Sequence, residues 1–147
     1  MSKWFSRSML ALSLPVVVTI VAPMTAHADD VSVTITVNAT GILLDRTLVR
    51  VPAEITCAPL EVRTNQGGAN LRQAVSGRIA FGQGFNENPI ICDGMPHTNS
   101  YLVWVDTASP APFRQGNATI QISAFLCSPT FVCESGGSGI QVIRLRR

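Results

Sequence analysis

The chain has 147 residues, 46% of them apolar, and its eleven basic residues outnumber nine acidic ones, giving a formal net charge of +2. Lys3 and Arg7 supply that excess, so the chain after them is formally neutral. Nucleic acids and anionic membranes are bound through clustered positive charge, and we therefore expect neither as a partner. Lys3 is the only lysine, which excludes Schiff-base and P-loop lysine chemistry from the rest of the chain.

Residues 1–28 have the layout of a secretory signal peptide. Lys3 and Arg7 form its positive region, residues 9–21 are an apolar stretch, and residues 26–28 match a small-x-small cleavage site. We expect cleavage after Ala28 and secretion of residues 29–147 as a single domain. No later segment approaches the ~20 apolar residues of a membrane span, so we expect none in the mature chain.

After residue 28 the apolar residues alternate with polar ones, which predicts strands and no helix. Residues 31–37 and 49–57 are the first two expected strands. Pro52 lacks an N–H group, which predicts that the second strand lies at an edge, is bulged or is split there. Residues 65–68 and Ser76-Gly77 are the next expected turns.

The second half of the chain continues this pattern. Residues 82–88 are expected to form a flexible loop. Residues 101–105 are apolar on both faces, which is typical of a central strand with Trp104 as its largest packing group. Residues 118–126 make the longest regular strand, and a change of phase between Val142 and Ile143 indicates a β-bulge.

Seven or eight short strands without helices predict an all-β domain. We expect an immunoglobulin-like β-sandwich of 7–8 strands with two disulfides, and a small closed barrel is the alternative.

Strand phase predicts how the four cysteines pair. Cys57 shares the apolar face of its strand, whereas Cys127 lies on the polar face, so a bridge across the core between them would require one strand to change register. We therefore predict Cys57–Cys92 as a clamp on the core side and Cys127–Cys133 as a local link on the outer side. An oxidising compartment favours disulfides over metal binding, and we expect no metal site.

Two motifs carry a resemblance to known proteins. Cys-Asp-Gly at residues 92–94 and Phe-x-x-Gly-x-Ala at residues 113–118, together with the strand ending at Cys57, resemble small secreted β-sandwich domains of actinobacteria. This resemblance implies a secreted bacterial domain of uncharacterised function and supplies no catalytic residues. A looser similarity to the apoproteins of enediyne chromoproteins, which differ in cysteine spacing, implies ligand carriage.

Catalytic signatures are weak in this chain. Asp93, His97 and Ser100 fall within eight residues and suggest a small secreted hydrolase, but the sequence lacks the Gly-x-Ser-x-Gly elbow. We interpret these three residues as part of a local turn that they stabilise by hydrogen bonds. We expect no catalytic residue and no cofactor.

The candidate binding residues are Phe85 and Asn86 in the expected loop, with Phe125 and Phe131 on the outer side. Outward aromatic residues in a cluster are typical of carbohydrate or protein binders. The basic end formed by Arg144, Arg146 and Arg147 is expected to protect an edge strand, and docking of an acidic wall polymer or phospholipid is the alternative. We therefore expect a secreted, non-enzymatic binding or structural module for an extracellular protein or glycan. A small-molecule carrier with a cleft between the sheets is the alternative, and the small hydrolase is the third.

Overall fold

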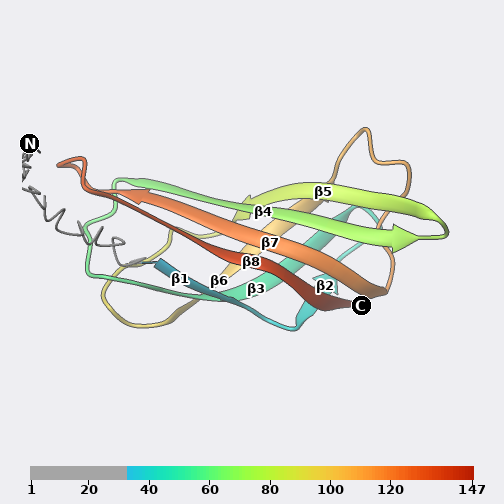
Figure 1. Ribbon diagram of the computed structural model, residues 1–147, viewed down its shortest axis with the longest axis horizontal. Helices are drawn as coiled ribbons and strands as arrows, with labels where there is room; N and C mark the ends of the chain where they lie inside the picture. Colours follow the sequence, from blue (N-terminus) through green and yellow to red (C-terminus); the bar gives the residue numbers. More distant parts are fainter. Residues whose placement is uncertain (1–32) are drawn as a thin grey trace, which may run out of the picture.

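The computed structural model describes residues 33–147, and the predicted signal peptide and cleavage site lie outside these residues. The described chain forms eight strands and no helix, which confirms the all-β class and the strand number (Figure 1). Within it, no helix is long and apolar enough to cross a membrane. The strands are β1 (Val33–Val37), β2 (Thr40–Leu43), β3 (Leu48–Cys57), β4 (Thr64–Val75), β5 (Arg78–Asn86), β6 (His97–Val105), β7 (Gly116–Cys127) and β8 (Cys133–Arg146).

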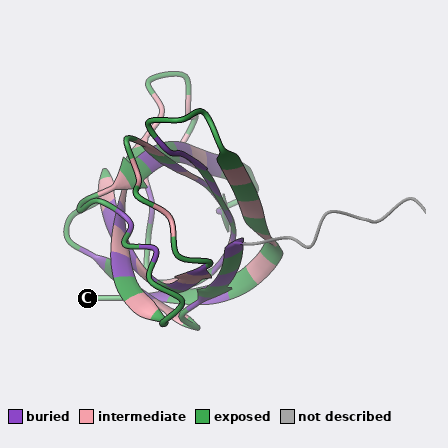
Figure 2. Ribbon diagram, turned by 90° about the vertical axis from the view of Figure 1, so that its left-hand side faces the viewer, coloured by how far each residue is buried: buried purple, intermediate pink, exposed green. Residues whose placement is uncertain are grey.

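The sheet closes on itself into a barrel. The order around the ring is β3, β2, β8, β7, β4, β5 and β6, and β6 pairs with β3 along its length. β1 pairs with the same edge of β3 as β2 does, and Figure 2 shows the ring end-on. The predicted immunoglobulin-like β-sandwich is therefore corrected to a closed seven-stranded β-barrel. The two folds share the alternation of inward and outward residues along each strand and differ in whether the edge strands pair with each other. The alternation of apolar and polar residues in the sequence does not distinguish these two cases.

Pro52 lies where the partner strand of β3 is broken. Ala53 pairs with Val37 of β1 and Arg50 pairs with Ile42 of β2, so Pro52 faces the gap between the two. Its carbonyl accepts a hydrogen bond from the Asn38 amide at 3.0 Å. Because the missing N–H would point into the same gap, no ladder bond is lost. β3 itself runs unbroken from Leu48 to Cys57 and is paired on both sides, so the prediction of an edge, bulge or split in this strand is corrected: the break lies in its partner, between β1 and β2.

Gly82 and Gly84 belong to β5, which corrects the prediction of a flexible loop over residues 82–88. Both glycines face inward, and a Cβ atom at either position would collide with the carbonyl oxygen of Trp104 or Leu102 on β6. The absence of side chains therefore lets β5 approach β6 closely at this bend. The glycine-rich composition that resembled a loop is instead a requirement of barrel curvature.

Inward-facing side chains from all eight strands fill the barrel. Full burial of each large aliphatic or aromatic side chain contributes about 1.5–3 kcal/mol relative to leaving it exposed. With Phe113 of the loop before β7, the largest almost completely buried side chains are Tyr101, Ile55, Leu71, Ile120, Ile122, Leu126, Ile143, Leu145, Val33, Val49 and Val51.

Three other predictions are corrected by strand phase. Residues 65–68 are the start of β4 rather than a turn. Trp104 faces outward and is half exposed, because Tyr101 and Val103 are the inward residues of β6. β8 keeps its phase through residues 140–145, and its register shift lies opposite residues 121–123 of β7. There Gly139 has a φ of 64°, a conformation that glycine adopts without strain.

Both predicted disulfides are present, as Cys57–Cys92 and Cys127–Cys133. The first is buried and ties the end of β3 to the loop before β6. The second joins the end of β7 to the start of β8 across the loop at residues 128–132. Two disulfides are typical of proteins that fold in an oxidising compartment.

The two ends of the barrel are built differently. At the end on the right of Figure 1, called the arginine end, the loops at residues 44–47, 76–77 and 106–115 meet the C-terminal part of β8. The opposite end, called the disulfide end, has the loops at residues 58–63, 87–96 and 128–132. Phe113, which is completely buried, closes the arginine end, and its amide donates to the Arg46 carbonyl at 3.0 Å.

Candidate functional site

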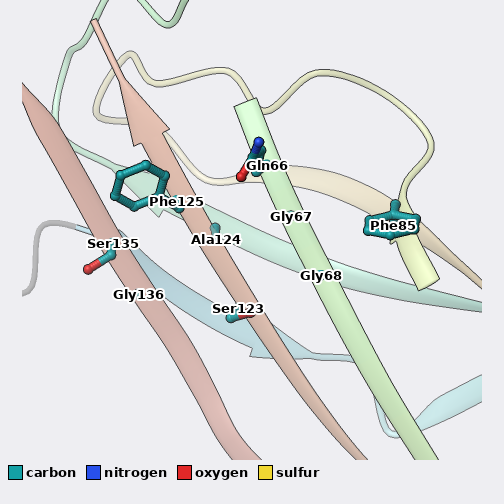
Figure 3. Close-up of a pocket in the computed structure, with 9 residues that line it drawn as sticks. All are labelled: Gln66, Gly67, Gly68, Phe85, Ser123, Ala124, Phe125, Ser135 and Gly136. Atoms are coloured by element: carbon teal, nitrogen blue, oxygen red, sulfur yellow. The ribbon is translucent and has the colours of Figure 1, made fainter. Parts of the chain in front are cut away.

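A groove of about 660 Å³ runs over the outer face of β4, β5, β7 and β8. Phe85 of β5 and Phe125 of β7 stand on either side of β4 (Figure 3). Phe85 is 67% exposed and Phe125 is 46% exposed, so both rings are available to a ligand. The groove is lined by Gln66, Gly67, Gly68, Phe85, Ser123, Ala124, Phe125, Ser135 and Gly136.

Small residues form the floor of the groove. Gly68 faces outward between Phe85 and Ser123, its partners in the neighbouring strands. Gly67 faces inward, and a Cβ atom there would lie 2.9 Å from the Tyr101 hydroxyl. Glycine is therefore required at 67 for core packing, and glycine at 68 leaves backbone accessible to a ligand.

Polar groups surround Phe125: Gln66 of β4 and Ser135 of β8 are its partners in the neighbouring strands, and Ser123 lies two residues before it on β7. Gln66, Ser123 and Ser135 are all exposed and present an amide and two hydroxyl groups, which both donate and accept hydrogen bonds. No charged residue lines the groove. The combination offers apolar ring faces and neutral hydrogen-bonding groups on a rigid sheet.

The register sets the length of the groove. Phe85 lies two strands away from Ser123, and Phe125 lies two residues further along β7. With strands ~4.8 Å apart and ~3.4 Å of rise per residue, the two Cα atoms are roughly 12 Å apart. An extended ligand of several units can contact both rings at once.

Tyr101 lies beneath this groove. Its side chain is completely buried, and burial raises the pKa of its hydroxyl to about 12, so the group stays neutral. Its hydroxyl oxygen has no hydrogen-bond partner in the described residues. Tyr101 therefore supports the floor from inside the barrel and does not reach the outer face.

The structure brings together only two of the four predicted binding residues, Phe85 and Phe125. Asn86 has a structural position: its Oδ1 accepts from the Gly67 amide at 3.0 Å, and its Nδ2 donates to Asn65 and Asn88. Phe131 is 85% exposed in the loop at residues 128–132 and does not line the groove.

Sequence reasoning missed Gln66, Gly68 and Ser135. Residues 65–68 were interpreted as a turn, which removed Gln66 and Gly68 from the sheet. The outward phase of β7, which carries Ser123 and Phe125, was visible in the sequence. Continuing the same alternation back through residues 64–70 would have placed Gln66 and Gly68 outward on β4.

Asp93, His97 and Ser100 do not converge. The His97 Nε2 lies 2.9 Å from Asp93 Oδ1, and the Met95 amide donates to the same oxygen at 2.8 Å. The Met95 hydrogen bond and the His97 contact lower the pKa of the Asp93 carboxyl. Ser100 has the outward phase of β6 whereas His97 has the inward one, an odd spacing that puts them on opposite faces. The Asp93–His97 pair therefore stabilises a local turn, as expected from the sequence.

Comparison with known proteins identified no relative: no family model, curated protein or solved structure matches the chain. The resemblances to secreted actinobacterial domains and to chromoprotein apoproteins remain predictions.

Proposed function

We propose that this protein is a secreted, non-enzymatic binding module whose outer face binds an extracellular glycan. The observation that carries the proposal is the groove between Phe85 and Phe125. Sugar rings present C–H faces that pack on aromatic rings, and their hydroxyl groups exchange hydrogen bonds with amides and hydroxyls. Gln66, Ser123 and Ser135 supply those groups.

A glycan fits the groove better than a protein partner does. Protein interfaces concentrate binding energy in tryptophan, tyrosine and arginine side chains that fill pockets, whereas this groove is shallow and lacks all three. Its residues stand on paired strands rather than on loops, so little conformational entropy is lost on binding.

The two other functional hypotheses lack such an observation. A small-molecule carrier needs an internal cleft, and the side chains of the core occupy the interior of the barrel. A hydrolase built on Asp93, His97 and Ser100 needs Ser100 beside the histidine, and the two lie on opposite faces of β6. Both arguments favour the binding module.

The test is retention of the secreted domain, residues 29–147, on chitin, cellulose and isolated bacterial cell-wall glycan, followed by titration with soluble fragments of any glycan that retains it. Phe85→Ala and Phe125→Ala should each weaken binding roughly tenfold or more, because each removes one ring that packs on the ligand.

Phe131→Ala is the matched control, since it removes an even more exposed ring outside the groove. It should leave the affinity unchanged, and all three variants should unfold at the temperature of the unmodified protein. Equal weakening by Phe131→Ala, or failure of every glycan to retain the protein, would overturn the proposal.

A further inference from the structure

Five arginines gather at the arginine end around two adjoining pockets. One pocket, of about 430 Å³, is lined by Leu43, Arg46, Phe113, Arg114, Gln115 and Arg147. The other, of about 560 Å³, is lined by Gln115, Gly116, Arg144, Leu145, Arg146 and Arg147. Because Gln115 and Arg147 line both, the two pockets form one continuous surface, which is separate from the groove between Phe85 and Phe125.

The backbone holds Arg46 and Arg114 beside each other. Phe113 is buried in the end of the barrel, and its amide bonds to the Arg46 carbonyl. Gln73, also buried, accepts from the Arg114 amide at 2.8 Å and donates to the Arg114 carbonyl at 2.7 Å. The loop that carries Arg114 is therefore fastened on both sides of the phenylalanine.

β8 pairs with β2 on one side and with β7 on the other, so it is not the edge strand that its arginines were expected to protect. Strand alternation presents these arginines to solvent. Arg144 and Arg146 point outward from β8 because Ile143 and Leu145 point into the core. The Arg144 amide donates to the Ala39 carbonyl at 2.9 Å, which fixes this part of β8 against the chain before β2.

No salt bridge to a side-chain carboxylate involves this cluster among the described residues. The salt bridges in the described part of the chain join Arg50 to Glu87 and His97 to Asp93, so neither of them involves the five arginines. The acidic residues in the loops of this end are Asp45, which accepts from Thr47, and Asp106, which accepts from Ala108. Neither lines the pockets. The cluster is a concentration of like charge in a chain whose formal charge after Arg7 is zero.

We infer that the arginine end binds the phosphate groups of an extracellular anionic polymer. Each guanidinium presents a planar set of donors that bonds two phosphate oxygens at once, and arginine keeps its charge at every physiological pH. The continuous surface offers room for more than one phosphate along the polymer.

A polyol or sugar phosphate fits this surface better than a nucleic acid or a membrane does. Single-stranded nucleic acids stack their bases on exposed aromatic side chains, and the one aromatic residue of the pockets, Phe113, is completely buried. Membrane-surface proteins line their basic surface with exposed apolar side chains, whereas the apolar residues that line these pockets, Leu43 and Leu145, are buried. Ile42 and Leu44, on either side of Leu43, are partly exposed but line neither pocket.

The experiment titrates the domain of residues 29–147 with poly(glycerol phosphate) at low salt and at physiological salt. Arg114→Gln and Arg146→Gln should each weaken binding roughly tenfold, and the double variant should weaken it further, since each change removes a charge-assisted contact. Affinity should fall as salt rises. Inorganic phosphate should compete only at much higher concentration, because it occupies one position of the surface.

Arg63→Gln is the matched control, because it removes the same charge from an exposed arginine at the disulfide end. It should leave the affinity unchanged, as should Phe85→Ala in the glycan groove. Equal weakening by Arg63→Gln would show that the polymer is attracted by the positive charge of the protein in general and not bound at the arginine end, which would overturn the inference. Binding to anionic lipid vesicles or to oligothymidylate, with none to poly(glycerol phosphate), would also overturn it.

Discussion

The two ends of the barrel are closed by different means. At the disulfide end, Cys57–Cys92 ties β3 to the loop before β6, and Cys127–Cys133 ties β7 to β8. At the arginine end, described residues include no disulfide, and Phe113 closes the barrel by packing. The loops closed by disulfides expose apolar side chains such as Ile91, Met95 and Phe131, whereas closure by packing uses one buried ring, Phe113, and leaves charged side chains exposed around it.

Side-chain amides fasten loops at both ends. At the disulfide end, Asn65 and Asn99 donate to the carbonyls of Ile90 and Asn88, which fastens the loop at residues 87–96 over the barrel. At the arginine end, Gln73 alone holds the Arg114 backbone through two hydrogen bonds. The comparison teaches that, in the described residues, the end without a disulfide is the one that gathers uncompensated charge.

The largest expected effect comes from removing the packed closure. Phe113→Ala should lower the free energy of unfolding by about 3–5 kcal/mol, because it leaves a cavity in place of a completely buried ring. It should also release the loop that carries Arg114. Chemical denaturation measures the first effect, and hydrogen exchange of the amides around residue 114 measures the second. A loss below about 1 kcal/mol would contradict the role assigned to Phe113.

Removal of the disulfides should have a smaller and graded effect. Replacing both Cys57 and Cys92 by alanine should cost about 3.8 kcal/mol of unfolding free energy, and replacing both Cys127 and Cys133 about 2.4 kcal/mol, because the first bridge closes the longer loop. Denaturation of the two double variants, each against the oxidised unmodified protein, checks the order. The reverse order would show that the packing around each bridge outweighs loop length.

Acidification should have the smallest effect on stability, and a similar one at the two ends of the barrel. Hydrogen bonds from the Thr47 hydroxyl and amide lower the pKa of the Asp45 carboxyl at the arginine end, and the Met95 amide and His97 lower that of Asp93 at the disulfide end. Each carboxylate therefore stabilises the fold above its unfolded pKa, and this contribution is lost as the pH falls below about 4. Both groups are exposed, so the effect is small.

Asp45→Asn and Asp93→Asn should each flatten the loss of stability between neutral pH and strongly acidic pH, measured by thermal denaturation. Glu61→Gln, at an exposed carboxylate of the disulfide end, is the control and should leave the curve unchanged. A steeper curve in either aspartate variant would contradict the sign of the lowered pKa.

Local rules in the sequence predicted much of this molecule. Two residues, Ser76 and Gly77, join β4 to β5 with positive φ at both, as the hairpin signal indicated. The phase of Cys57 and Cys127 within their strands predicted both disulfides. Errors arose where a small residue has a tertiary role: the glycines of β4 and β5 were interpreted as turn and loop residues.

By itself, the sequence determined which residues alternate between the two faces of each strand, because that alternation is set by backbone geometry within a few residues. Only the tertiary structure decided that β3 pairs with β6, so that the sheet closes into a barrel rather than a sandwich. The pairing of β4 with β5 and with β7 places Phe85 and Phe125 on either side of β4, and the folded barrel brings Arg46 and Arg114 next to the end of β8. These pairings join residues far apart in the chain, and no local pattern specifies which distant strands become neighbours.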